Sequence, residues 1–291
     1  MPLEKRVQIL SMMVEGSSMR AISRVADVSI NTVTKLLIDA GLACARFHDV
    51  AVRGVQAKQI QCDEIWSFCY AKARNVETAT AAPGWAGDIW TWTALDRDSK
   101  LIVSYLVGGR DSEYANAFMD DLKDRLATRV QLTTDGHRAY LNAVEDAFGD
   151  DVDYAQLVKL YGEAPEDSPE RKYSPAICRG ARKDRVTGNP DKALISTSHV
   201  ERQNLSMRMH MRRFTRLTNA HSKKFENHCH MVALYTVWYN FARMHSAVKM
   251  SPAMAAGVSD TLWDMSDIVK LIDAAAPKLG RRGPYKKDNS N

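Results

Sequence analysis

Residues 60–68 read IQCDEIWSF, an apolar run with two adjacent acidic residues at its centre. Its β-branched and aromatic side chains favour a strand, which we predict over residues 60–70. A carboxylate in an apolar strand loses its hydration, and this is unfavourable unless the group is paired or binds a metal. Asp63 therefore needs an explanation beyond packing. Because successive side chains of a strand alternate between faces, we expect the neighbouring Glu64 to point to the opposite face.

Two further acidic residues occur in patterned segments downstream. Asp135 ends a short apolar run, VQLTTD, and is followed by Gly136. Glu201 lies in the segment SHVERQN at residues 198–204, which opens a long helical pattern. An Asp-Gly pair alone is a common turn dipeptide. Asp135 is therefore a candidate site residue only in combination with the other acidic segments. Two carboxylates at strand positions and a third on a later helix can hold two divalent cations.

The elements around these acidic residues follow a definite order. Strands are predicted at residues 60–70, 89–95, 101–108, 130–134 and 152–160, and helices at 112–126 and 137–148. The turn-like residues 96–100 join the second and third strands as a hairpin, and a long helix begins at Ser198. This is the order of the ribonuclease H-like fold, in which the middle of the first strand and the end of the fourth lie side by side. We therefore predict an α/β fold with a mixed sheet and flanking helices, with Asp63 and Asp135 as neighbours.

The N-terminal segment has a different pattern, with short helices predicted at 3–14, 19–26 and 30–40. Ser29 is a good N-cap for the third helix, and Gly41 is expected to end it. Residues 18–37 resemble a helix-turn-helix, whose second helix enters the major groove through its N-terminal half. The candidate DNA contacts are Ser29, Asn31, Thr32, Thr34 and Lys35.

One position departs from the helix-turn-helix pattern. Asp27 stands where such turns usually carry Gly, and Asp tolerates the left-handed conformation at some cost. A three-helix bundle without a role in DNA binding is the alternative. We divide the chain into a helix-turn-helix domain (1–45), a linker (46–59), a ribonuclease H-like domain (60–258), and a C-terminal helix with a basic tail (259–291). The basic, Gly- and Pro-containing residues 277–291 are expected to be disordered and available for phosphates.

Length, charge and cysteine content limit the class of protein. The 291 residues allow one large domain, or a small domain and a larger one. A net charge of +5 and a pI near 8.9 permit a nucleic-acid partner without requiring one. The five cysteines are irregularly spaced and include no CxxC, which favours reduced thiols over a disulfide framework or a zinc ribbon. No signal peptide opens the chain, and no apolar run approaches the roughly 20 residues of a membrane helix, so we expect a cytoplasmic protein without membrane contact.

Three segments together resemble the catalytic boxes of DDE transposases, in particular those of bacterial insertion sequences of the insertion sequence 1 type. They are QCDEIWS (61–67), TTDGHRAY (133–140) and TSHVERQN (197–204). A fourth segment, YNFARMH (239–245) followed by SPAMAA (251–256), resembles the closing element of such cores. The resemblance covers about residues 1–258. Members of this group often carry an N-terminal zinc finger, for which this chain lacks the cysteines.

The resemblance implies a metal-dependent DNA transposase. Asp63, Asp135 and Glu201 would be the catalytic and metal-binding residues, with Asp63 bridging two Mg²⁺ or Mn²⁺ ions, Asp135 holding one and Glu201 the other. The same site would hydrolyse DNA at the end of the element to free a 3′-OH, and would then use this 3′-OH to attack target DNA. Double-stranded DNA would be the partner. Because two ends must be brought together, a homo-oligomer is expected on DNA.

The helix that begins at Ser198 has two faces at 3.6 residues per turn. The first face comprises Glu201, Asn204, Arg208, Arg212 and Thr215. The second face comprises Val200, Met207, Met211 and Phe214. We expect the apolar face to pack on the sheet, and Arg208, Arg212 and Arg216 to contact DNA beside the metal site. A basic helix face that is merely solvated is the alternative.

Several other residues compete for a role. His137 and His199 stand near the carboxylates and could touch the scissile phosphate or orient a ligand, although a surface or capping role is nearly as good an interpretation. Asp88 and Asp96 are better explained as turn formers. A second group of candidate ligands comprises His221, His228, Cys229 and His230. Their spacing fits no zinc pattern, and the helix predicted at 225–241 is better explained as core.

Three rival functions use different features of the sequence. A DNA-binding regulator would use the first 40 residues but has no need for three placed carboxylates. A ribonuclease H-like nuclease without joining activity would use the same carboxylates, but would not need the helix-turn-helix or the arginines. A tyrosine recombinase would use Arg, His and Tyr, and no arrangement around Arg243 and His245 indicates one. Inverted repeats flanking the reading frame would favour the transposase, and metal dependence would exclude the tyrosine recombinase.

Overall fold

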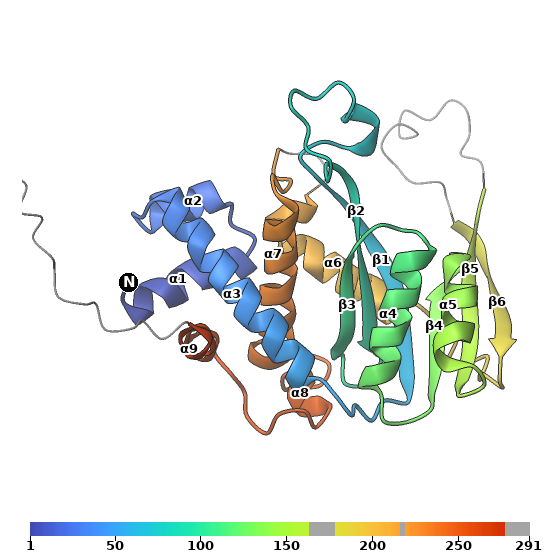
Figure 1. The fold of residues 1–291 in the computed structure, drawn as a ribbon. Helices are drawn as coiled ribbons and strands as arrows, with labels where there is room; N and C mark the ends of the chain where they lie inside the picture. The colour runs from blue at the N-terminus through green and yellow to red at the C-terminus, as the bar shows by residue number, and fades with distance from the viewer. Residues whose placement is uncertain (163–177, 216–218, 277–291) are drawn as a thin grey trace, which may run out of the picture.

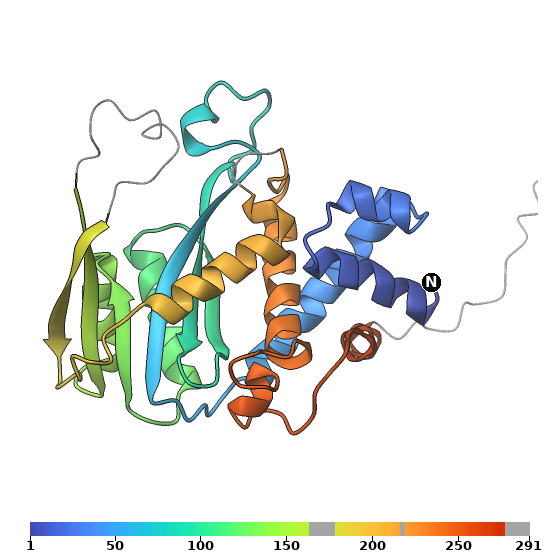
Figure 2. The same cartoon turned by 180° about the vertical axis from the view of Figure 1, so that it is seen from behind.

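The computed structural model describes residues 1–162, 178–215 and 219–276. A six-stranded mixed sheet carries helices on both faces, and a group of N-terminal helices packs beside it (Figures 1 and 2). Within the described residues, no single helix has the length and apolar character needed to cross a membrane. The helices α2 and α3 meet that test only as a pair, and the chain bends by 117° between them.

The first three helices are α1 (Leu3–Val14), α2 (Met19–Val25) and α3 (Ile30–Ala51). The hydroxyl of Ser18 accepts a hydrogen bond at the start of α2, and that of Ser29 accepts one at the start of α3, as predicted for Ser29. Asp27, in the connection, has a φ of +48°. The bend of 117° lies in the range of a helix-turn-helix pair. Contact with DNA remains a prediction.

The predicted end of the third helix at residue 40 is wrong, because α3 continues to Ala51. Gly41 lies inside the helix, where α3 crosses α7 (Phe225–Val237). A Cβ atom at this position would lie only 2.3 Å from the Cβ of His230. Gly41 is therefore present for close helix packing and not as a helix terminator. The division of the chain into domains stays a prediction.

The sheet has the order β3-β2-β1-β4-β5-β6. Its strands are β1 (Gln59–Cys69), β2 (Gly87–Asp96), β3 (Ile102–Gly108), β4 (Val130–Asp135), β5 (Val152–Tyr161) and β6 (Cys178–Thr187). The strands β1, β4 and β5 run parallel to one another, and β2, β3 and β6 are antiparallel to their neighbours. The order β3-β2-β1-β4-β5 fits the ribonuclease H-like fold. The sequence did not predict β6, because this edge strand is exposed along most of its length and lacks alternating apolar residues.

Helices cover the two faces of the sheet. One face carries α4 (Ser112–Arg125) and α5 (Ala139–Phe148), which lie in front of it in Figure 1. The other face carries α6 (Ser198–His210), which crosses β1 in Figure 2. The short elements are η1 (Ala73–Asn75), η3 (Arg212–Phe214), η4 (Trp238–Ala242) and α8 (Pro252–Ala255), and the last described helix is α9 (Met265–Ala275). The N-cap of α4 is Asp111 and not the predicted Ser112, since the Asp111 carboxylate accepts two backbone N–H groups.

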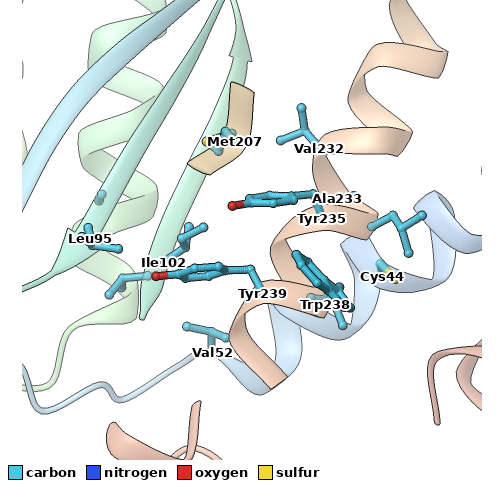
Figure 3. Packing of buried hydrophobic residues seen from close by; sticks show 14 of the residues in the cluster. Cys44, Val52, Leu95, Ile102, Met207, Val232, Ala233, Tyr235, Trp238 and Tyr239 are labelled. Atoms are coloured by element: carbon cyan, nitrogen blue, oxygen red, sulfur yellow. The ribbon is translucent and has the colours of Figure 1, made fainter. Parts of the chain in front are cut away.

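The core between the sheet and α3 is built largely by α7 and the π-helical turn η4 that continues it. The rings of Tyr235 and Tyr239 are stacked with centroids 5.9 Å apart. Figure 3 shows both hydroxyl groups directed toward the side of the sheet, where Leu95 and Ile102 lie. Both tyrosines are buried, together with Val232 and Trp238, so the prediction of a core helix in this region is confirmed.

Candidate active site

The sheet register brings Asp63 and Asp135 together. The strands β1 and β4 pair in parallel, and the last pair in register is Gln61 with Thr133. Two residues further along each strand are Asp63 and Asp135. Residues in register on parallel strands present their side chains on the same face. The two carboxylates therefore lie side by side where β4 ends, as the sequence predicted.

A third carboxylate, that of Glu64, joins this pair. One carboxylate oxygen from each of Asp63, Glu64 and Asp135 lies within 4.8 Å of the others. The sequence argument set Glu64 aside because it points to the other face of β1. Alternation separates side chains across a continuous sheet, but β4 ends at Asp135, so this carboxylate can be approached from both faces. The adjacency of two acids in an apolar strand was the signal that could have identified Glu64.

Glu64 is held on its own side of β1 by an arginine. Its side chain is only 1% exposed, and Nη2 of Arg110 lies 3.3 Å from Oε2. The same Arg110 nitrogen lies 3.8 Å from Oδ2 of Asp135. The other Glu64 oxygen, Oε1, is buried with no hydrogen-bond partner among the described residues. The guanidinium group of Arg110 thus lies beside two carboxylates, and its single positive charge does not compensate the negative charges of the cluster.

The pKa values report the same excess of negative charge. Burial, followed by the charge of Asp135, raises the pKa of Asp63 to about 6. Burial and the charge of Asp135 also raise the pKa of Glu64 to about 8, although Arg110 opposes this shift. Nδ2 of Asn204 donates a hydrogen bond of 2.8 Å to Oδ2 of Asp63 and fixes its orientation. A site that disfavours its own ionised carboxylates in this way is suited to a bound cation.

Glu201 lines the same cleft from the first turn of α6 but lies outside the compact cluster. Its Oε1 accepts a hydrogen bond from Oγ1 of Thr197 and lies 2.7 Å from Nζ of Lys159. Its negative charge contributes to the raised pKa of Asp63. The structure therefore places all three predicted carboxylates around one opening, with Glu201 held by Lys159.

The opening is a cleft of about 1000 Å³, here called the acidic cleft. Its lining includes the carboxylates of Asp63, Asp135 and Glu201 and the basic side chains of Arg110, Arg138, Lys159 and Arg208. Asn204 and Arg208 join Glu201 on one face of α6, as predicted. The opposing apolar residues Val200 and Met207 are buried against the sheet, also as predicted.

The predicted arginine stripe is wrong beyond Arg208. The helix α6 ends at His210, because Met211 has extended backbone angles (φ −119°, ψ 107°). Arg212 therefore lies in η3 and lines a different cavity, which it shares with Arg20 and Thr34. Thr215 also follows the break, so it does not continue the Glu201 face. Arg216 lies outside the described residues, as does the basic tail of residues 277–291.

The helix-turn-helix candidates separate into two groups. Asn31, Thr32 and Lys35 line a groove between α3 and the end of α9. Thr34 lines the cavity that contains Arg212, and its hydroxyl donates to the carbonyl of Ile30. Ser29 is exposed and caps α3. Four of the five predicted contacts therefore line two different hollows, and their contact with DNA stays a prediction.

The two auxiliary histidines lie in different places. His137 lines the acidic cleft, and its backbone N–H donates to Oδ1 of Asp135 at 2.9 Å. Burial, followed by the charge of Arg110, lowers the pKa of the His137 ring. His199 lines a separate cavity on another face of α6, where its Nδ1 lies 3.3 Å from Nζ of Lys100.

The acidic cluster is the one group of His, Cys, Asp and Glu side chains in the described ranges that can hold a metal ion. The second candidate group, around His228 and Cys229, does not form such a cluster there. His228 is buried, and its ring lies within hydrogen-bonding distance of the hydroxyls of Ser222 and Ser67. The predicted turn former Asp96 behaves as expected, since it accepts hydrogen bonds from the backbone of Asp98 and Ser99. Asp88, in contrast, lies within β2, and its carboxylate accepts the backbone N–H of Ala73.

Comparison with known proteins gives a likeness in structure alone. No family model matches the chain, and no curated protein matches its sequence. Among solved structures, the chain is similar to the piggyBac transposase in a synaptic complex with hairpin DNA. The TM-score is 0.39 and the sequence identity is 9%, over 96% of this chain and 73% of that chain. At these values the likeness describes the course of the chain and carries no argument about activity.

Proposed function

We propose that this protein is a metal-dependent DNA transposase of the DDE type, which cuts DNA at the ends of an insertion element and joins those ends to a target. The observation that carries the proposal is the acidic cleft, where Asp63, Asp135 and Glu201 meet from β1, β4 and α6. The three sequence segments that resemble the transposase boxes are the segments that supply these carboxylates. A packed protein without such chemistry would have no reason to gather the largely buried carboxylates of Asp63 and Glu64 beside the more exposed ones of Asp135 and Glu201.

The donor set fits hard divalent cations. Asp63, Asp135 and Glu201 would hold two Mg²⁺ or Mn²⁺ ions, and Glu64, whose Oε1 lacks a hydrogen-bond partner among the described residues, extends this set. When bound, a pair of such ions polarises the phosphoryl group, activates the attacking oxygen and stabilises the leaving oxygen. The ions would also compensate the carboxylate charge that raises the pKa values of Asp63 and Glu64.

The remaining residues of the cleft position the carboxylates and the DNA. Asn204 holds the carboxylate of Asp63 through a hydrogen bond. Thr197 and Lys159 hold that of Glu201. Arg208 lies one turn beyond Asn204 on α6 and lines the same cleft, where a phosphate backbone would pass. The lining of the cleft thus offers acidic groups for metal and basic groups for DNA.

Recognition of the element ends is assigned to α2 and α3 under this proposal. The bend of 117°, the serine caps and the exposed side chains of Asn31 and Lys35 support a helix-turn-helix. The partner would be double-stranded DNA, and the active form would be a homo-oligomer on two DNA ends. We further propose that the protein acts in the bacterial cytoplasm, where such DNA is found.

A cleavage assay tests the proposal directly. Labelled duplexes from the flanks of the reading frame, where the proposal expects the inverted repeats of an insertion element, are incubated with the full chain and Mg²⁺. The wild type is compared with the Asp63→Asn, Asp135→Asn and Glu201→Gln variants, and the exposed Asp146→Asn is the matched control. We expect the wild type and the control to release a 3′-OH, and the three cleft variants to bind the duplex without cutting it.

The same assay separates the rival functions. Addition of an unlabelled target plasmid distinguishes joining from simple cutting, because a nuclease gives cut ends without joined products. If the protein were a DNA-binding regulator, the wild type and the variants would bind the duplex, and none of them would cut it. Cutting by all three cleft variants at the wild-type rate would show that the carboxylates have no catalytic role.

A further inference from the structure

A second polar cavity lies on the face of α6 that is turned away from the acidic cleft. Four α6 residues, His199, Arg202, Gln203 and Ser206, contribute to its lining. The acidic cleft is lined instead by Glu201, Asn204, Leu205 and Arg208. At 100° per residue these two sets lie on nearly opposite sides of the helix. The cavity has a volume of about 400 Å³.

The lining of this cavity is unusually rich in nitrogen groups. Its ionisable side chains are those of Lys100, His199, Arg202, Tyr239, Arg243 and His245, and we call this cavity the basic pocket. They come from the turn between β2 and β3, from α6, from η4 and from the segment that follows η4. Among the residues that the structure describes, no carboxylate lines the pocket.

The cations of the basic pocket also lack acidic partners nearby. Across residues 1–162, 178–215 and 219–276, no ion pair joins Lys100, Arg202 or Arg243 to a carboxylate. Burial lowers the pKa of Lys100, although Asp98 and Asp96 oppose this shift. Asp96 accepts hydrogen bonds from the backbone of the β2–β3 turn, and neither acid lines the pocket. The cations of the pocket are therefore not neutralised by ion pairs among the described residues, and the acids that act on Lys100, Asp98 and Asp96, belong to its own turn.

The backbone of the turn places Lys100 in the pocket in an uncommon conformation. Lys100 has a φ of +68°, in the left-handed region that favours glycine. Its Nζ donates to the carbonyl of Arg97 and lies 3.3 Å from Nδ1 of His199. The turn accounts for the positive φ, because the backbone N–H of Lys100 donates to the carbonyl of Asp96, and the contact with His199 places the ammonium group in the pocket lining.

The remaining contacts fix the other donors. The guanidinium of Arg243 lies 5.4 Å from the centre of the Trp238 ring, which orients it. Nδ1 of His245 accepts the backbone N–H of Ala247, so its Nε2 carries the proton and is a donor. Arg243 and His245 belong to the YNFARMH segment, to which the acidic cleft gives no role.

The chemistry of the pocket identifies its ligand as an anion with several oxygen atoms. Like charges that converge in a half-buried pocket are unfavourable until an anion compensates them. Two guanidinium groups, one ammonium group and imidazole donors match the tetrahedral oxygens of a phosphate group. The polar groups of Gln203 and Ser206 supply further donors in the same lining.

We propose that the basic pocket binds a backbone phosphate of the DNA substrate, so that one duplex contacts both sides of α6. This rests on the proposed function, because it takes the ligand to be the DNA that enters the acidic cleft. The pocket anchors the strand away from the cutting site, and the carboxylates act on the other side of the helix. The YNFARMH segment serves as the anchor of the substrate.

The test measures the salt dependence of DNA binding by fluorescence anisotropy, with a labelled duplex and the full chain without divalent metal. The Lys100→Gln/Arg202→Gln variant is compared with the wild type. The control is Lys123→Gln/Lys270→Gln, which removes the same charge from α4 and α9, away from α6. Each lost phosphate contact lowers the slope of log K against log salt by about 0.9.

For the pocket variant we expect affinity at least about tenfold weaker at moderate salt and a slope smaller by about 0.9, the change for one lost phosphate contact. The control is expected to match the wild type. Because removing a repelling cation relieves the pocket, the variant should unfold at a temperature no lower than the wild type. An unchanged slope in the pocket variant, with a normal melting temperature, overturns the proposal.

A second arm distinguishes DNA from a free phosphate compound. Inorganic phosphate and pyrophosphate are added during thermal unfolding of the wild type and the pocket variant. Strong stabilisation of the wild type alone, together with unchanged DNA binding by the variant, would assign the pocket to a small phosphate ligand and overturn the DNA proposal. DNA binding is measured without cleavage. A protein that binds through the pocket but never cuts would therefore contradict the proposed activity and not the pocket.

Discussion

The acidic cleft and the basic pocket lie on opposite faces of a single helix, α6, and carboxylates cluster in the first whereas basic groups gather in the second. Each gathers groups of like sign that repel one another in the free protein. In the cleft the repulsion raises the pKa of Asp63 to about 6, and in the pocket Lys100 and Arg243 lower the pKa of His245, after the effect of burial. A helix that separates two such sites is suited to a ligand that brings cations to one side and phosphates to the other.

The two sites also differ in how the fold builds them. The carboxylates of Asp63 and Asp135 stand on paired strands, where the register fixes their separation. The basic groups of Lys100 and Arg243 stand on a turn and on a segment after a π-helical turn. Strand positions hold catalytic groups within narrow limits, whereas turns allow an anchor to adapt. This difference fits chemistry on one side of α6 and binding on the other.

The largest effect is expected from Asp63→Asn, which should reduce Mg²⁺-dependent DNA cleavage by at least about a thousandfold, or roughly 4 kcal/mol in activation free energy. The change removes a proposed metal ligand but keeps the side-chain volume. Single-turnover cleavage of a labelled duplex measures the effect, with a binding assay on the same duplex as control. A variant whose cleavage rate lies within tenfold of the wild-type rate would show that the acidic cleft is not the catalytic face of α6.

The next effect concerns stability against pH in the absence of metal. The pKa of Asp63 is raised to about 6, so the folded state holds this proton between about pH 4 and pH 6, where the unfolded chain has lost it. Stability therefore falls as pH rises through that window, by roughly 3 kcal/mol for this group. The raised pKa of Glu64 extends the fall to about pH 8.

Urea unfolding at several pH values measures this dependence. The Asp63→Asn variant should show a shallower loss of stability above pH 4 and should exceed the wild type at pH 8. Saturating Mg²⁺ should restore the wild type, since a bound cation compensates the carboxylates. If the stability of the variant falls equally steeply as pH rises, the Asp63 carboxylate is not the cause of that fall.

Two neighbouring residues on the two faces of α6 give the next comparison, in which the smaller effect is the loss of DNA affinity in Arg202→Gln. Glu201→Gln should abolish cutting and leave DNA affinity unchanged or slightly improved, because it removes a negative charge from the cleft. Arg202→Gln should weaken DNA affinity by about tenfold, or roughly 1.4 kcal/mol, and leave the cleavage of bound DNA nearly intact. Affinity and single-turnover rates are measured separately. The same pattern for both variants would mean that the two faces do not have distinct roles.

The smallest effect is expected from Asp27→Gly in the connection between α2 and α3. Asp27 has a φ of +48°, which glycine adopts without strain. The substitution should stabilise the protein by about 1 kcal/mol or less, since glycine also gains entropy in the unfolded chain. Thermal unfolding measures the change. A clear loss of stability would show that the Asp27 side chain has a role in this turn, which lies far from both faces of α6.

Local patterns in the sequence were sufficient to predict the elements whose buried residues alternate, as in a strand, or repeat with the period of a helix. The strand around Asp63 and the apolar face of Val200 and Met207 were predicted because their partners are near in sequence or their periodicity is clear. The same approach failed for Gly41. Glycine often ends a helix, but Gly41 lies inside α3, where the absence of a side chain allows close packing against α7. It also failed for Arg212, because helical periodicity does not reveal that α6 ends at His210.

The sequence by itself determined the strand and helix pattern and pointed to Asp63, Asp135 and Glu201, because a carboxylate in an apolar setting is unfavourable without a partner. The tertiary structure alone decided that Glu64 joins Asp63 and Asp135, since β4 ends at that point and leaves its last carboxylate open to both faces. It alone brought Lys100, Arg202 and Arg243 into one pocket. These residues are far apart along the chain, and only the packing of a turn against α6 and the end of η4 sets the distances between their charges.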